Sequence, residues 1–226
     1  MDKIQNYVKR KASKKTKDIQ FIYGGIKISY KDEFENEVSL EGAIKKIRSL
    51  IPKKFLTKID LIYVGAFPFL QKRNINAMYE GGLIYLSNEQ EDQEDLVDDL
   101  IHEIAHAVEA AHGKMIYHDG RLETEFLNKR KKLYQTLGAY KENPPEKALF
   151  YDIDYNKKLD DYFYKKIGYE KLQHFVMGVF PSTYSTSSLK EYFAIGFEMY
   201  YLDGPNNLKD CKVLLEKIGE LDDAKS

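Results

Sequence analysis

The sequence predicts an α+β fold, with a small twisted β-sheet in residues 18–87 and mostly helices after it. Glycine pairs at Gly24-Gly25 and at Gly81-Gly82 each separate two short runs rich in β-branched and aromatic residues. This pattern is typical of tight β-hairpins. Beyond the second pair, apolar residues recur at spacings of three and four, which indicates amphipathic helices.

Length and composition are ordinary for a soluble protein with one sizeable core, since the chain has 226 residues, 43% hydrophobic and 31% charged. The net charge of -1 argues neither for nor against nucleic acid as a partner. The single cysteine, Cys211, excludes an internal disulfide. We find no signal peptide and no apolar run of membrane-spanning length. We therefore expect cytoplasmic synthesis, with any export, as of a toxin, by a non-classical route.

Residues 1–17 form a basic N-terminal arm with a single aromatic residue, Tyr7. Basic segments can bind the phosphates of a nucleic acid, but its nucleobases stack on aromatic side chains, of which this arm has one. A solvated tail is therefore favoured over a nucleic-acid-binding arm. Residues 18–226 are expected to form a single domain with a helical insert at about 113–178.

The sheet half is predicted to begin with a hairpin of strands Ile19–Tyr23 and Ile26–Tyr30. Ser39 can cap an amphipathic helix, which Pro52 stops. The run Ile59–Val64 is largely apolar, so we expect it to be a central strand.

A second hairpin is predicted from Ala77–Glu80 and Leu83–Leu86, and we expect the latter to be an edge strand able to pair with another chain. Ser87 or Asn88 is expected to cap the helix that follows. The acidic run Glu91–Asp99 suits the positive end of that helix. Later helices are expected at residues 121–137, 157–176 and 189–202, and a last one after Gly204-Pro205.

The segment His102-Glu103-Ile104-Ala105-His106 lies in the first of these helices and contains two of the five histidines of the chain. Histidines four residues apart lie on one helix face, so both can bind one metal ion. Glu103 lies one step round the helix, where it can contact a water on the open side of the metal. Asp98 and Asp99, about one turn earlier, either orient His102 or are solvated charges, and we favour the second.

A hydrolytic zinc site needs a third protein ligand. His112 would complete a metzincin-like pattern, but Glu109 replaces the glycine at which the helix of that pattern breaks. In an unbroken helix His112 lies about 15 Å beyond His102, too far to share a metal. Glu191 is the other candidate. Ser188 and Glu191 also form a capping-box pattern, in which the carboxylate of Glu191 caps its own helix. Local spacing alone favours neither role, metal ligand or helix cap.

The His-Glu-x-x-His motif, followed downstream by Glu191-Tyr-Phe-Ala194, resembles the anthrax lethal factor-like and Pro-Pro endopeptidase family of zinc metallopeptidases. The resemblance implies a zincin-like fold in which Glu191 is the third zinc ligand. It also implies that Tyr184, seven residues before Glu191, directs its hydroxyl at the metal. The chain differs from this family in its long insert and in lacking an export signal.

Together the motif and the resemblance imply an endopeptidase that hydrolyses a protein or peptide substrate. His102, His106 and Glu191 would bind Zn²⁺, while Glu103 would transfer protons and Tyr184 would stabilise the oxyanion. The alternative is an inactive, metal-stabilised module whose basic arm binds nucleic acid or an acidic protein. A structural zinc normally has four protein ligands, and no such set is visible in the sequence.

Overall fold

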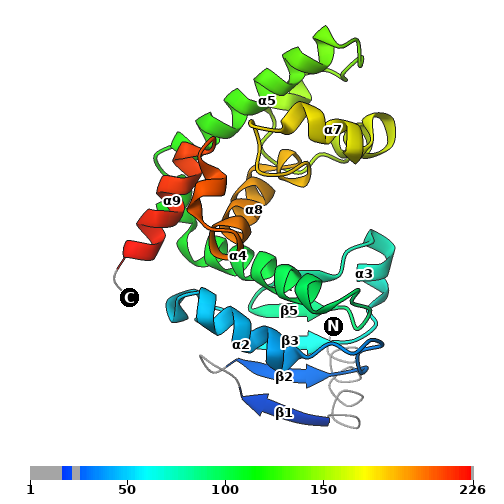
Figure 1. The fold of residues 1–226 in the computed structure, drawn as a ribbon, viewed down its shortest axis with the longest axis vertical. Helices are drawn as coiled ribbons and strands as arrows, with labels where there is room; N and C mark the ends of the chain where they lie inside the picture. The colour runs from blue at the N-terminus through cyan, green and yellow to red at the C-terminus, as the bar shows by residue number, and fades with distance from the viewer. Residues whose placement is uncertain (1–16, 22–25, 225–226) are drawn as a thin grey trace, which may run out of the picture. The chain divides into compact units, whose positions relative to one another are not determined.

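The computed structural model describes residues 17–21 and 26–224 and has an α+β fold, as predicted (Figure 1). Residues 1–16 of the basic arm and residues 22–25, where the first hairpin turn is predicted, lie outside the described residues. The strands are β1 (Lys17–Phe21), β2 (Lys27–Tyr30), β3 (Leu61–Val64), β4 (Ala77–Glu80) and β5 (Leu83–Leu86).

One helix contains the His-Glu-x-x-His segment, and the others precede or follow it in the chain. They are α2 (Leu40–Leu50), α3 (Pro68–Arg73), α4 (Gln93–Tyr117), α5 (Arg121–Ala139), α6 (Lys157–Asp161), α7 (Tyr169–Val176), α8 (Leu189–Leu202) and α9 (Lys212–Asp223). Shorter turns are the 3₁₀ segments η2 (Lys53–Leu56), η3 (Lys147–Tyr151), η5 (Tyr184–Thr186) and η6 (Pro205–Leu208), and the π-helix η4 (Tyr162–Ile167).

The five described strands form one sheet in the order β1-β2-β3-β5-β4. β3 pairs in parallel with β2 and β5, which confirms its central place, while β1 and β4 pair antiparallel with their hairpin partners. The prediction that Leu83–Leu86 is an edge strand is wrong, because β5 lies between β3 and β4. The two edge strands of the described sheet are β1 and β4. The hairpin turn specifies that β4 and β5 pair, but not which of them a third strand joins.

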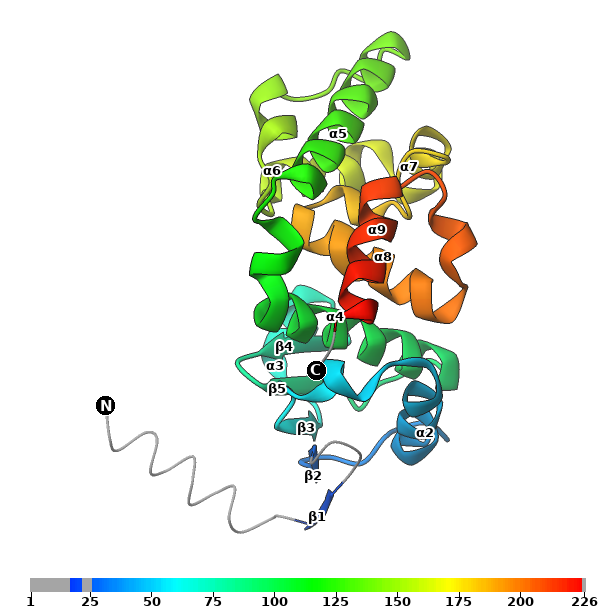
Figure 2. The same ribbon diagram turned by 90° about the vertical axis from the view of Figure 1, so that its left-hand side faces the viewer.

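One face of the sheet forms the core of the N-terminal half. The in-register residues Ile62 and Ile84, and Val64 and Leu86, are buried. Figure 2 shows α2 beside this sheet. α2 begins as predicted, because the Oγ of Ser39 accepts a hydrogen bond from a backbone N–H of the first turn.

The cap of α4 differs from the prediction. Asp92, not Ser87 or Asn88, accepts hydrogen bonds through Oδ1 from the backbone N–H groups of Glu94 and Asp95. Ser87 and Asn88 instead bond to backbone groups that precede the helix. A short loop therefore separates β5 from α4, and an aspartate at the N-cap satisfies the first amides.

The described contacts group the chain into two compact units, Met1–Ala107 and Val108–Ser226, and the residues of α4 belong to both. The second unit is helical, as expected for the C-terminal half. The helix predicted at 157–176 is interrupted, since α6 passes into the π-helix η4 and Gly168, with φ of 80°, precedes α7. Glycine adopts such a positive φ without steric cost.

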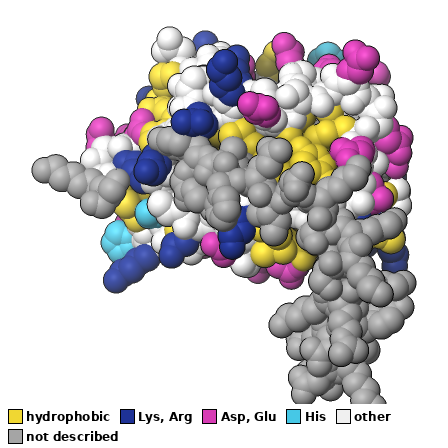
Figure 3. Space-filling model, turned by 90° about the horizontal axis from the view of Figure 1, so that it is seen from below, with side chains coloured by type: hydrophobic (Ala, Val, Ile, Leu, Met, Phe, Trp, Pro, Cys, Tyr) yellow, Lys and Arg dark blue, Asp and Glu magenta, His cyan; other side chains and the backbone are white. Residues whose placement is uncertain are grey.

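α8 packs closely on α9 within this second unit, because Gly196 lies directly against the side chain of Leu214. Cys211 is buried at the N-cap of α9. None of the described helices is long and apolar enough to cross a lipid bilayer. In the described part of the face shown in Figure 3, basic and acidic side chains are interspersed.

Candidate metal centre

α4 holds the two motif histidines on one face. It runs without a break from Gln93 to Tyr117, and the ring centroids of His102 and His106 lie 4.9 Å apart. The apolar side of the helix, at Leu100 and Ile104, is buried. Burial of that side leaves the histidine face half-buried and able to bind a ligand.

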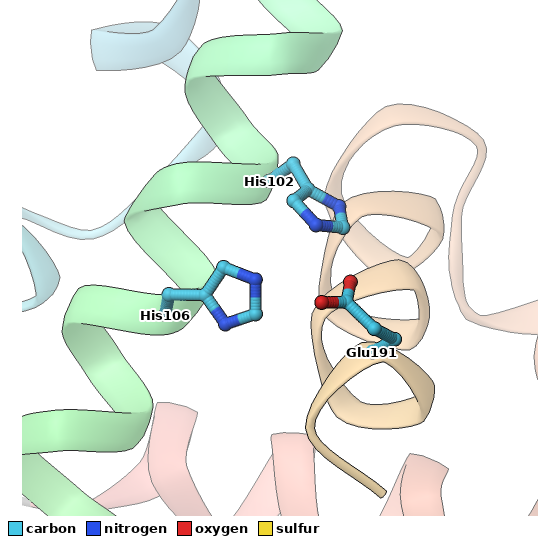
Figure 4. Close-up of side chains that lie close together, drawn as sticks. All are labelled: His102, His106 and Glu191. Carbon is cyan, nitrogen blue, oxygen red and sulfur yellow. The ribbon is translucent and has the colours of Figure 1, made fainter. Parts of the chain in front are cut away.

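Glu191 lies in the first turn of α8. The Oγ of Ser188 accepts a hydrogen bond of 3.1 Å from the backbone N–H of Glu191, which is one half of the predicted capping box. The Glu191 carboxylate, however, lies with the two imidazoles. One ligand atom from each of His102, His106 and Glu191 lies within 4.8 Å of the other two, and Figure 4 shows the three side chains pointing toward one another.

The chemistry of this donor set fits a metal ion. Two imidazole nitrogens and one carboxylate oxygen are a ligand combination found in catalytic zinc sites, where the remaining position is open. Other first-row divalent ions also accept imidazole and carboxylate ligands. The three side chains therefore form a candidate metal-binding triad.

His112 is not part of the triad. α4 continues through Glu109 and His112, so the helix break that a metzincin-like site needs is absent from this helix. Glu109 is buried, and the hydroxyl of Tyr117 donates a 3.0 Å hydrogen bond to its Oε1. The residue that replaces the metzincin glycine thus has a structural partner two turns further along the same helix.

Tyr117 is a neighbour of the triad that the sequence analysis missed. Its pKa is raised by burial first, then by the negative charges of Glu109 and Glu191. The hydroxyl therefore stays protonated and remains a donor at neutral pH. Its eight-residue offset from Glu109 on one helix was a detectable signal, but nothing in the sequence placed Glu191 nearby.

Glu103 is 7% exposed, and its carboxylate is bonded to the sheet. Oε2 accepts a 2.5 Å hydrogen bond from the backbone N–H of Tyr79 on β4. This bond fixes the orientation of the carboxylate and satisfies an outward-facing amide of the edge strand. The predicted proton-transfer group is therefore held in a defined position.

Tyr184 occupies the 3₁₀ turn η5, directly before α8. The residue is 37% exposed, but burial of its hydroxyl end raises its pKa, and the charge of Glu191 raises it further. The structure thus places Tyr184 close enough to Glu191 for an electrostatic interaction. A phenol with a raised pKa is a hydrogen-bond donor at neutral pH.

The interpretation of Asp99 as a solvated charge is wrong. Its Oδ2 is buried with no hydrogen-bond partner among the described residues. Burial raises the pKa of Asp99 to about 7, although a hydrogen bond from Asn76 and the nearby His102 both lower it. Asp99 therefore lies in the surroundings of His102, and its charge is costly there.

Arg130 organises the loop that carries Tyr184, and no sequence pattern pointed to it. It is fully buried in α5 and donates hydrogen bonds to the backbone carbonyls of Thr186 and Ser187, and to those of Leu149 and Asp152. Burial lowers the pKa of its guanidinium to about 10, so it stays charged at neutral pH. Arg130 thus fixes the backbone between Tyr184 and the start of α8.

Glu125 of α5 holds the residue next to Glu191. The hydroxyl of Tyr192 donates a 2.8 Å hydrogen bond to Oε1 of Glu125. The backbone N–H groups of Val213 and Leu214 also donate to this carboxylate, which therefore caps α9 from another helix. These bonds fix α8 against α5 and α9.

No protein-family model, curated protein or solved structure matches this chain. The likeness to the lethal factor-like peptidases therefore rests on the motifs of the sequence. The fold contains a candidate metal-binding site formed by two histidines and one glutamate.

Proposed function

We propose that the protein is a zinc-dependent endopeptidase. The observation that carries this proposal is the grouping of His102, His106 and Glu191, which combines the two motif histidines with a distant carboxylate. The same grouping supports the likeness to the lethal factor-like peptidases, because Glu191 is the residue that the resemblance selects. Zinc bound by these residues would polarise the scissile carbonyl and acidify a water molecule.

The side chains of the chain itself supply the proton transfers. Glu103, oriented by Tyr79, accepts a proton from the attacking water and delivers it to the leaving amine. Tyr184 donates a hydrogen bond to the oxygen on which negative charge develops, which requires a protonated phenol. The raised pKa of Tyr184 is consistent with that requirement.

The main chain of the substrate pairs with β4 in this proposal. The hydrogen bond from Tyr79 to Glu103 shows that Tyr79 directs its N–H away from β5, and Ala77, two residues earlier, has the same orientation. The N–H of Tyr79 is already bonded to Glu103, so an extended peptide would bond to the other outward-facing groups of β4, such as those of Ala77. The scissile bond would then lie near Glu103.

Cleavage of a quenched-fluorescent peptide library tests the proposal. The protein is reconstituted with zinc and compared with its Glu103→Gln variant and with protein treated with a chelator. We expect cleavage by the zinc-loaded wild type alone. Equal cleavage by the Glu103→Gln variant, or no cleavage of any library by folded zinc-loaded protein, would contradict the proposal. The alternative binding module depends on the basic arm, and no described residue favours it.

A further inference from the structure

A cluster of exposed tyrosines surrounds one aspartate in the second unit. Tyr155, Tyr164 and Tyr169 are 55%, 58% and 36% exposed. Asp160 is half-buried among them. We call these four residues the Tyr–Asp patch.

The backbone brings the patch together. Asp160 and Tyr164 are four residues apart on the continuous helical segment formed by α6 and η4, so they lie on roughly the same side. The turn at Gly168 then places the ring of Tyr169 against that of Tyr164, with centroids 5.4 Å apart and planes at 55°. The hydroxyl of Tyr155 donates a 2.8 Å hydrogen bond to Oδ2 of Asp160. π-Helices occur frequently at functional sites.

The patch carries a negative charge that no ion pair in the described part of the chain balances. The neighbouring Asp161 is paired with Lys157 at 2.6 Å and Lys165 at 2.7 Å. Among the described residues, Asp160 has no salt bridge, and its hydrogen-bond partner is the neutral hydroxyl of Tyr155. Lys165 interacts with Asp160 electrostatically, but its ammonium group pairs with Asp161. The carboxylate of Asp160 can therefore still bind a cation from outside the chain.

The Tyr–Asp patch lies close to Glu191, the residue of the metal-binding triad that belongs to the same unit. The backbone N–H of Leu189 donates a 2.8 Å hydrogen bond to the carbonyl of Ile153. Tyr155 is two residues from one partner of this bond, and Glu191 is two residues from the other. The negative charge of Asp160 also raises the pKa of Tyr184, as expected for groups that lie near each other.

We propose that the Tyr–Asp patch binds a lysine or arginine side chain of the peptide substrate, within a few residues of the scissile bond. This inference rests on the proposed peptidase function. Aromatic faces and a carboxylate together attract a cation, whereas an apolar side chain placed there would desolvate Asp160 without compensation. The patch is thus a specificity-determining site for a basic residue.

The test measures binding separately from cleavage. Two labelled Gly/Ser peptides are compared, one carrying several lysines and the other norleucine, an uncharged chain of similar length, at the same positions. Fluorescence anisotropy gives their affinities for the zinc-loaded Glu103→Gln variant, which does not consume the peptide. We expect the lysine peptide to bind about five- to tenfold more tightly, a preference typical of partly exposed cation–π and ionic contacts.

Two substitutions decide whether the patch is responsible. Asp160→Asn should reduce the preference for lysine to less than about twofold, whereas the matched control Asp161→Asn, whose carboxylate already pairs with two lysines, should leave it unchanged. Tyr164→Ala should weaken binding of the lysine peptide. Equal affinity for both peptides, or a preference that survives Asp160→Asn, would overturn the inference.

Cleavage assays with wild-type protein separate this inference from the proposed function. Cleavage of library peptides without a preference for lysine or arginine would overturn the specificity site and leave the peptidase function intact. A lysine preference that depends on Asp160, in a protein that cleaves nothing, would refute the peptidase function and the role of the patch in substrate selection.

Discussion

The backbone N–H of Tyr79 donates a hydrogen bond of 2.5 Å to the carboxylate of Glu103. This bond joins the glutamate of the His-Glu-x-x-His motif to β4, one of the two edge strands of the described sheet. In a peptidase, the proton-transfer group and the strand that binds the substrate must be held in register, because small displacements of reacting groups reduce the rate greatly. The bond from Tyr79 holds Glu103 in a fixed position relative to β4.

Glu103→Gln should abolish proton transfer and leave the fold intact. The amide oxygen can still accept the hydrogen bond from Tyr79, but the side chain no longer accepts a proton. We expect kcat to fall by about 10²–10⁴ with zinc content unchanged. Steady-state peptide hydrolysis and metal analysis measure the two effects. Glu94→Gln, at an exposed site in the first turn of α4, is the control, and near wild-type turnover in Glu103→Gln would remove Glu103 from the mechanism.

Tyr184→Phe removes a single hydroxyl. If that hydroxyl stabilises the oxyanion, kcat should fall by about 10²–10³ while KM and zinc content change little. Tyr140→Phe, at a residue that is 68% exposed, is the control. A rise in KM alone would assign Tyr184 to substrate binding instead.

Arg130→Met should destabilise the second unit. It leaves the buried carbonyls of Thr186 and Ser187 without their donor. Unsatisfied buried polar groups cost about 1–3 kcal/mol each, so we expect the free energy of unfolding to fall by at least about 3 kcal/mol. Urea denaturation measures the change. Arg121→Met, which removes an exposed ion pair with Glu216, should have little effect.

Asp99→Asn should change how stability depends on pH. The folded-state pKa of Asp99 is raised from 3.8 to about 7, so the unfolded chain loses this proton first as pH rises, and the fold loses stability between these values. The variant lacks this loss. In metal-free protein its free energy of unfolding should exceed that of wild type by on the order of 2 kcal/mol at pH 8, with a much smaller difference near pH 4. A gap that does not vary with pH would contradict this origin.

The parts of the fold that depend on local signals were predictable. The paired glycines specify the hairpin of β4 and β5, and Ser39 and Ser188 cap α2 and α8 where the sequence indicates. The place of β5 inside the sheet depends on its pairing with β3, which no local pattern encodes. The local pattern predicted Ser87 or Asn88 as the cap of α4, whereas Asp92 caps it.

In the candidate site, too, local features could be predicted from the sequence and tertiary contacts could not. The spacing of His102 and His106 on one helix is a local property. Glu191 needed the family resemblance, because its neighbours allowed a capping role equally well. Arg130 could not have been found, since a charged side chain is usually exposed and only tertiary packing buries it. The spacing of Tyr117 and Glu109 on one helix is a local signal, but the proximity of Tyr117 to Glu191 depends on tertiary packing.

The zinc content of purified, zinc-reconstituted protein tests the central claim most directly. We expect about one zinc per chain in wild type and in His112→Ala, and less than about a tenth of that in Glu191→Ala, because two histidines alone bind zinc weakly. Elemental analysis after exhaustive dialysis gives these values, and circular dichroism confirms that each variant is folded. Folded wild type without zinc, or full zinc occupancy in Glu191→Ala, would contradict the account.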